Sequence, residues 1–189
     1  MKMKYSDDAK YKAGLLGFEI LYFDFCRDQF KRSLRYTSIF TLLSFIIILV
    51  SKHGFFYFIK VVTDIGLNVT PDILGFTIAG YAMIVGLSNT NAMNILKGSV
   101  LDSGISMFQQ LNTTFIAMLL SALLNLILCV IAKIVTAAEI KVPLCSWLIE
   151  SFNGLSYLIL VISTFYVVFS IKDLLSNLFS VGQFLQLVK

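Results

Sequence analysis

ILGFTIAGYAMIVGLSNTNAMNIL, residues 73–96, is an uncharged run between Asp72 and Lys97. A helix rises about 1.5 Å per residue, so this run is long enough to cross a bilayer whose hydrocarbon core is about 30 Å thick. Glycine costs a helix interior roughly 1 kcal/mol, and small residues let membrane helices approach closely, so the small residues of this run predict an assembly face. Gly75, Ala79, Ala82 and Gly86 recur at helical spacing, and Gly80 of the same face lies on a neighbouring line.

The composition of the whole chain is typical of a membrane protein. Of its 189 residues, 58% are hydrophobic and 14% are charged, and the apolar residues fall in long blocks. The first block begins only near Tyr36, whereas a cleaved secretory signal has its apolar part nearer the start and ends in a small-residue cleavage site. We therefore expect one membrane domain whose first span is retained.

Four membrane spans can be drawn in the chain. Their predicted bounds are 36–51, 73–96, a segment within 103–132, and 152–171. The first span can continue into the aromatic residues 55–59, and the second has Pro71 in its first turn with Thr70 as its cap. Neither strand-like alternation nor an internal repeat is evident, so the predicted fold is all-α, a polytopic membrane protein with four transmembrane helices.

The segments outside the spans have amphipathic patterns. Phe18, Tyr22 and Phe25 recur at i, i+4 and i+7, which predicts an N-terminal amphipathic helix on the membrane surface or below the spans. From Leu174 to Val188 apolar residues alternate at spacings of 4 and 3, which fits a coiled coil or an interfacial helix. The predicted domains are a cytoplasmic segment 1–35, a four-helix transmembrane domain 36–171 and a cytoplasmic tail 172–189.

The distribution of Lys and Arg predicts the orientation. Eight of them lie in the segment that ends at Arg35, and Lys97, Lys172 and Lys189 fall on the same side of the membrane. The other side has four, at Lys52, Lys60, Lys133 and Lys141. By the positive-inside rule, both termini are expected in the cytoplasm.

Few residues of the chain suit catalysis or metal binding. Within the predicted spans no Asp, Glu, Lys, Arg or His lies away from an end, and Asp72 and Asp102 are interpreted as helix starts, where a carboxylate stabilises the helix dipole. His53 is the only histidine, and the three cysteines form no CxxC. We expect no enzyme, no metal and no cofactor. A proton-coupled transporter is disfavoured, because it normally needs a carboxylate within the membrane.

The polar residues of the second and third spans are neutral and allow two interpretations. Amides and hydroxyls in membrane helices usually hydrogen-bond to neighbouring helices, at about 0.6 kcal/mol each. Alternatively they line a narrow water path, because uncharged amides replace part of an ion's hydration without trapping the ion. The clustering of amides at one end of the two spans favours a cytoplasmic pore mouth. The candidate pore-lining residues are Asn89, Asn91, Asn94, Asn112, Ser121 and Asn125.

Four basic residues before the first span also allow two interpretations. Arg27, Lys31 and Arg35 share a helical face, and Arg32 flanks it. Such residues usually meet anionic headgroups, at about 1 kcal/mol per residue. The alternative is a cytoplasmic binding site for a nucleotide or a DNA oligomer, with nearby aromatic rings for base stacking.

The stretch PDILGFTIAGYAMIVGLSN, residues 71–89, and the order of a basic amphipathic segment followed by four spans resemble the membrane effector of the Hailong anti-phage defence system. The resemblance implies a homo-oligomeric, tetramer-like ion channel in a bacterial inner membrane, controlled by a nucleic-acid oligomer that a partner nucleotidyltransferase makes. It carries over no catalytic residue and no individual ligand contact. We therefore expect a gated channel. The competing hypotheses are a structural or accessory membrane subunit and, third, a small-molecule transporter.

Overall fold

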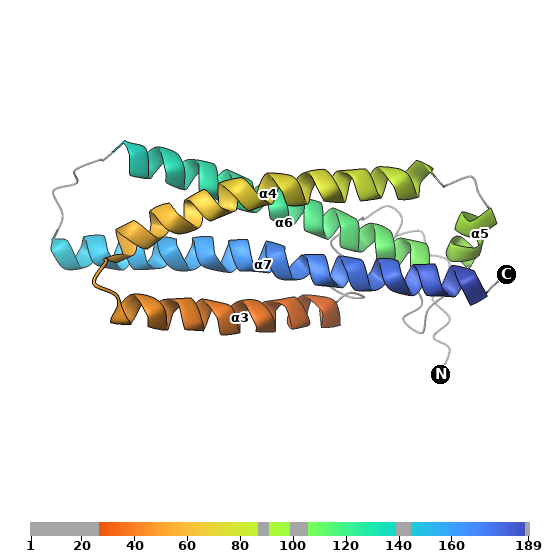
Figure 1. Ribbon diagram of the computed structural model, residues 1–189, viewed down its shortest axis with the longest axis horizontal. Helices are drawn as coiled ribbons and strands as arrows, with labels where there is room; N and C mark the ends of the chain where they lie inside the picture. Colours follow the sequence, from red (N-terminus) through yellow and green to blue (C-terminus); the bar gives the residue numbers. More distant parts are fainter. Residues whose placement is uncertain (1–26, 87–90, 99–105, 139–144, 188–189) are drawn as a thin grey trace, which may run out of the picture. The chain divides into compact units, whose positions relative to one another are not determined.

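The chain is helical throughout the residues that a computed structural model describes, which are 27–86, 91–98, 106–138 and 145–187 (Figure 1). The helices are α3 (Arg27–Val50), α4 (Phe55–Gly86), α5 (Asn91–Gly98), α6 (Met107–Ala137) and α7 (Ser146–Leu187). Four of them, α3, α4, α6 and α7, are long and apolar enough to cross a membrane. The predicted all-α class and the predicted number of spans are confirmed.

The predicted bounds of the second span are wrong. Helix α4 begins at Phe55 and ends at Gly86, and the last residues of the predicted span belong to another helix, α5 (Asn91–Gly98). Pro71 therefore lies inside a helix, and the hydroxyl of Thr70 accepts a hydrogen bond from Asn125 in place of capping a helix start. Proline costs a soluble helix about 3 kcal/mol, but in membrane helices neighbouring groups and local adjustments satisfy the freed carbonyls.

The other spans also differ from their predicted lengths. Helix α3 starts at Arg27, well before the first predicted span, and residues 55–59 belong to α4 and do not continue that span. Helix α7 passes through Lys172 without a break, so the fourth span and the predicted tail are one helix. The predicted N-terminal amphipathic helix lies outside the described residues, apart from the part in α3.

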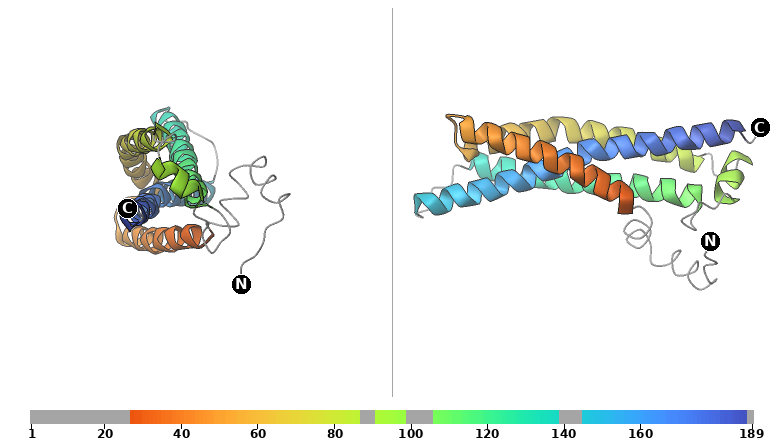
Figure 2. Two further views of the ribbon diagram at one scale, coloured as in Figure 1. Left: turned by 90° about the vertical axis from the view of Figure 1, so that its right-hand side faces the viewer. Right: turned by 90° about the horizontal axis from the view of Figure 1, so that it is seen from below.

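Helices α4, α6 and α7 each contribute to two compact units of the chain. Unit 2 consists of 33–75 and 120–169, and unit 1 holds 76–119 and 170–189 together with the chain up to Arg32. In unit 2 parts of α3, α4, α6 and α7 lie alongside one another (Figure 2). Their shared core is apolar and aromatic, with Ile48, Ile59, Cys129, Tyr157, Leu160 and Val161 buried together.

Unit 1 has a core of its own around Phe115, which is fully buried. A Cβ added to Gly80 of α4 would lie 3.2 Å from Cε1 of Phe115, so this glycine lets α4 approach α6 closely. Asn177 of α7 donates a hydrogen bond of 2.9 Å to the Thr114 hydroxyl of α6. These contacts join three helices within unit 1.

A capping box fixes the start of α6. The Ser106 hydroxyl accepts a hydrogen bond from the backbone N–H of Gln109, and the Gln109 side chain accepts one from the backbone N–H of Ser106. This reciprocal pair satisfies two backbone donors that a helix start leaves free. It explains why the helix begins at Met107, with its polar first turns included.

Candidate functional site

A buried polar cluster surrounds Asn125 in unit 2. The Asn125 amide is fully buried and donates a hydrogen bond of 2.8 Å to the Thr70 hydroxyl of α4. Its carbonyl oxygen accepts bonds from Ser163 and Thr164 of α7, the second at 3.1 Å. One side chain of α6 is therefore bonded to both neighbouring helices, as the helix–helix interpretation predicts.

Close packing of the backbone surrounds this cluster. A Cβ added to Gly66 of α4 would overlap the sulfur of Cys129, and it would lie 3.7 Å from Nδ2 of Asn125. Cys129 in turn places its sulfur 3.9 Å from the Asn125 carbonyl oxygen. Glycine at position 66 is therefore the residue that allows α4 and α6 to meet at the polar cluster.

The remaining candidate pore-lining residues lie in different elements. Asn91 and Asn94 belong to α5, where Asn94 is exposed, and Asn89 lies outside the described residues. Asn112 and Ser121 are half-buried on α6, in unit 1 and unit 2 respectively. Of the six candidates, Asn125 is the one that the structure places in the buried polar cluster.

Helix α4 has two opposite sides with different exposure. Its buried side is formed by residues at alternating spacings of 4 and 3, namely Ile59, Thr63, Gly66, Thr70, Ile73 and Thr77. The opposite side has the same spacing, and all of its members are exposed. They are Asn68, Asp72, Gly75, Ala79, Ala82 and Gly86, and we call them the outward line of α4.

The small residues of the outward line are not covered by any residue that the structure describes. A Cβ added to Gly75 or Gly86 would meet no atom within 4 Å, whereas one added to Gly80 meets Phe115. Of the five residues of the predicted assembly face, Gly80 thus packs inside the protomer, and the other four stay exposed. Small residues at helical spacing with nothing packed on them are typical of a helix face that approaches another helix.

The polar residues of the outward line lie within the membrane-crossing part of α4. Neither the stretch before Asp72 (55–71) nor the stretch after it (73–86) reaches the about 20 residues that a spanning helix needs. A span of about 20 residues drawn on α4 therefore contains Asp72, and the candidate span Phe55–Gly86 holds acids away from its ends, where the sequence predicted none. Asn68 and Asp72 make no hydrogen bond or ion pair with the part of the chain that the structure describes.

The error has a definite source in the sequence. Pro71 and Asp72 together are typical of a helix start. Because a helix was expected to begin there, Asn68 and Asp72 were not grouped with the small residues that follow at the same spacing. The alternation of 4 and 3 from Asn68 to Gly86 was the signal that could have identified the outward line.

The comparisons with known proteins leave the site to be interpreted from its own geometry. The chain matches no protein-family profile, no curated protein and no solved structure.

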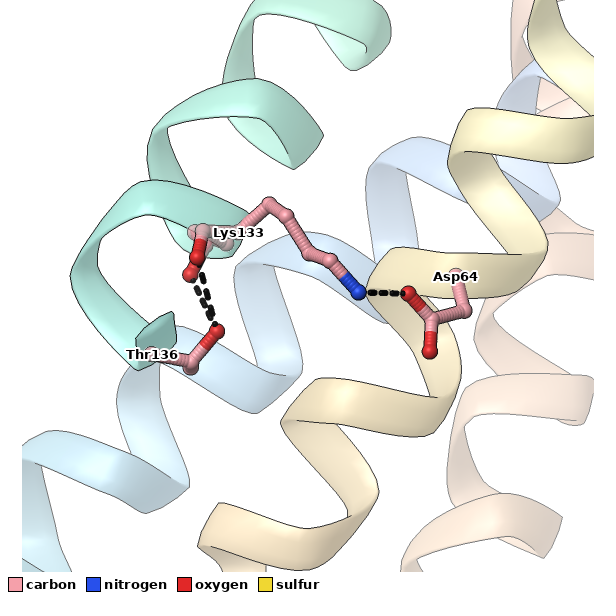
Figure 3. Close-up of polar contacts among 4 residues, drawn as sticks. Asp64, Lys133 and Thr136 are labelled. Carbon is pink, nitrogen blue, oxygen red and sulfur yellow. Dashed lines mark hydrogen bonds and ion pairs between the residues drawn. The ribbon is translucent and has the colours of Figure 1, made fainter. Parts of the chain in front are cut away.

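An ion pair joins α4 to α6 near one end of unit 2 (Figure 3). Nζ of Lys133 lies 2.6 Å from Oδ1 of Asp64, and the two side chains are 54% and 53% exposed. The stretch 65–86 is itself long enough to cross a bilayer, so Asp64 can lie at the membrane boundary. Exposed ion pairs of this kind contribute about 1 kcal/mol or less to stability.

The candidate anion-binding residues lie on α3. The side chains of Lys31, Arg32 and Arg35 are exposed there, and the side chain of Arg27 is outside the described part of the structure. Among the described residues, no group of three His, Cys, Asp or Glu side chains is arranged to hold a metal ion.

Proposed function

We propose that the protein self-associates in the membrane through the outward line of α4 and that copies of this line border a gated ion path. The observation that carries the proposal is Asp72, a carboxylate on the outward side of a helix long and apolar enough to cross a membrane, with no partner among the described residues. A charged residue at the centre of a membrane helix costs about 2.5–3.5 kcal/mol when it faces lipid. Such residues therefore face a protein interior or water, and Asp72 is exposed and has no partner in the part of the protomer that the structure describes.

The two halves of the outward line have different roles in this proposal. Ala79, Ala82 and Gly86 let the α4 helices of neighbouring copies approach closely. Asn68 and Asp72 face the axis, where the helices stand further apart and admit water. A ring of carboxylates attracts cations, so the path is cation-selective. The buried Asn125 cluster holds α4 against α6 and α7 while the outward line serves the assembly.

The same carboxylate favours a second candidate function, a proton-coupled transporter. The argument from sequence against this class was the lack of an acid inside the membrane, and Asp72 removes that argument. A transporter needs its carboxylate to change protonation during each cycle, whereas a channel needs only its charge. Passive current in the absence of a substrate or proton gradient therefore distinguishes a channel from a transporter.

Control of the path is assigned to an anionic cytoplasmic ligand on α3. The support is the exposure of Lys31, Arg32 and Arg35 next to the first span and the resemblance to the Hailong effector, which implies a DNA oligomer and an anti-phage role. Reversal of these charges is expected to abolish binding of short DNA oligomers without changing membrane insertion. Unchanged binding would remove this part of the proposal.

The test of the proposed function is the current that purified full-length protein passes in planar bilayers. We expect cation-selective current. Under a salt gradient, Asp72→Asn should shift the reversal potential towards the equilibrium potential of the anion. Glu150→Gln, which removes an exposed carboxylate at the start of α7, is the matched control and should leave selectivity unchanged. A stable oligomer that passes no current would favour the accessory-subunit hypothesis and contradict the channel.

A further inference from the structure

One end of unit 2 has the composition of a membrane boundary. At this end α4 and α7 begin and α6 ends (Figure 1). Trp147 and Tyr57 are exposed there, at 66% and 49%. Tryptophan and tyrosine are enriched where lipid headgroups meet hydrocarbon. The placement agrees with α4, whose stretch 65–86 suffices to cross the bilayer and leaves the first turns of α4 at headgroup level.

A groove of about 250 Å³ opens at this end between α4, α6 and α7. Its walls are mainly apolar, formed by Phe56 of α4, by Leu128 and Ala132 of α6, and by Ile159 of α7. Asn153 and Ser156, both on α7, add an amide and a hydroxyl to this lining. The groove is therefore an apolar slot with two polar groups from α7 and a third, the Thr136 hydroxyl of α6, which donates to carbonyl oxygens of its own helix.

The two polar groups that α7 adds to the groove have no hydrogen-bond partner in the described protein. Asn153 is half-buried and Ser156 is exposed, and the side chain of neither makes a hydrogen bond within the described ranges. Other hydroxyls of α7 are satisfied by the helix itself, as Ser151 is by the Trp147 carbonyl. Moving a polar group out of water without a new hydrogen-bond partner costs free energy. Asn153 and Ser156 therefore favour an occupant that has polar atoms of its own.

A cation lies beside the groove. Nζ of Lys60 is 4.8 Å from the centroid of the Phe56 ring, which is one of the groove walls. Lys60 is exposed and forms no ion pair with a described residue. By contrast, Lys133, which follows the groove residue Ala132 on α6, forms an ion pair with Asp64. The groove therefore combines an unbalanced positive charge, two hydrogen-bonding groups and an apolar slot.

We propose that this groove binds an anionic phospholipid. An acyl chain lies along Phe56, Leu128 and Ile159, the ester or glycerol oxygens bond to Asn153 and Ser156, and the phosphate lies next to Lys60. A charge, two hydrogen-bonding groups and an apolar wall thus occur together at the end of unit 2 where Trp147 and Tyr57 are exposed, as an anionic lipid at a membrane boundary requires. A lipid phosphate supplies the counter-charge that Lys60 lacks among the described residues, so we favour the lipid over a helix of a second copy.

Native mass spectrometry of the full-length protein tests the lipid site. The probes are phosphatidylglycerol and phosphatidylcholine with the same acyl chains, added to delipidated protein. We expect phosphatidylglycerol to be retained about fivefold better than phosphatidylcholine, the ratio that one cation near an anionic headgroup implies. Lys60→Gln should abolish this preference, and Lys52→Gln, an exposed lysine in the preceding turn, should keep it.

A second pair of variants tests the apolar slot. Ser156→Phe fills the groove from an exposed position, so it should leave the fold intact and reduce retention of both lipids. Ser156→Ala removes only the hydroxyl and should retain the acyl chain. Equal loss of preference in the two lysine variants, or full retention of lipid in Ser156→Phe, would overturn the proposal. A shift from dimer to monomer in Ser156→Phe without any lipid adduct in the wild type would assign the groove to a second copy and would equally overturn it.

Discussion

Two groups of polar side chains in unit 2 differ in the side of the helix that they occupy. Asn125 lies on the buried side of α6 and has partners on α4 and α7 of the same chain. Asn68 and Asp72 lie on the side of α4 opposite its buried residues, and no described residue bonds to them. A polar residue in a membrane helix therefore indicates assembly or a water path only if it lies on the side of the helix that does not pack against the rest of the chain.

Replacement of Asn125 should have the largest effect on the protomer. Asn125→Ala removes three inter-helix hydrogen bonds, which at about 0.6 kcal/mol each lowers the free energy of unfolding by about 2 kcal/mol. The measurement is unfolding in mixed detergent micelles. Asn112→Ala, on the same helix but with no hydrogen bond to described residues, is the control and should change stability little. Equal effects of the two variants would contradict the structural role of Asn125.

Replacement of Gly86 should affect the assembly while the protomer stays folded. An added side chain meets no atom within 4 Å in the protomer, but it would separate two α4 helices that pack through the outward line. We expect Gly86→Leu to weaken self-association at least tenfold, about 1.4 kcal/mol, as measured by light scattering in detergent. Gly182→Leu on α7, where an added Cβ also meets open space, is the matched control. If both variants keep the oligomer size of the wild type, the outward line is not an interface.

Loss of the ion pair between α4 and α6 should have the smallest effect. Lys133→Gln leaves Asp64 exposed to water and headgroups, so the free energy of unfolding should fall by less than about 1 kcal/mol. The same unfolding assay measures it. A loss of about 3 kcal/mol or more would mean that Asp64 lies in hydrocarbon, which would move the membrane boundary and with it the depth of Asp72.

The sequence predicted the number of spans because long apolar blocks need no knowledge of neighbours. It did not predict the start of α4, because Lys60 and Asp64 are typical of a loop until their partners are known. The partner of Lys60 is the Phe56 ring, one helical turn earlier on α4. The partner of Asp64 is Lys133, which belongs to α6. The capping box at Ser106 and Gln109 was visible in the sequence, since both residues have the required spacing.

The candidate sites were predictable to different degrees for the same reason. Spacing alone identified Gly75, Ala79, Ala82 and Gly86 as one helix face. Spacing puts Gly80 on a neighbouring line, but it could not show that Gly80 packs inside the protomer, because its partner Phe115 belongs to another helix. Likewise, an asparagine such as Asn125 fits a pore or a helix contact equally well until the hydroxyls of Thr70 and Thr164 are placed beside it.

Disulfide cross-linking in native membranes tests the central claim most directly. In a chain with Cys26 and Cys145 replaced by Ser, Ala79→Cys lies on the outward line, and its neighbour Gly80→Cys faces Phe115 inside the protomer. If α4 helices of neighbouring copies pack through this line, mild oxidation should convert Ala79→Cys to covalent dimers and leave Gly80→Cys monomeric. Absence of dimers with Ala79→Cys, or equal dimer yields at both positions, would contradict the account.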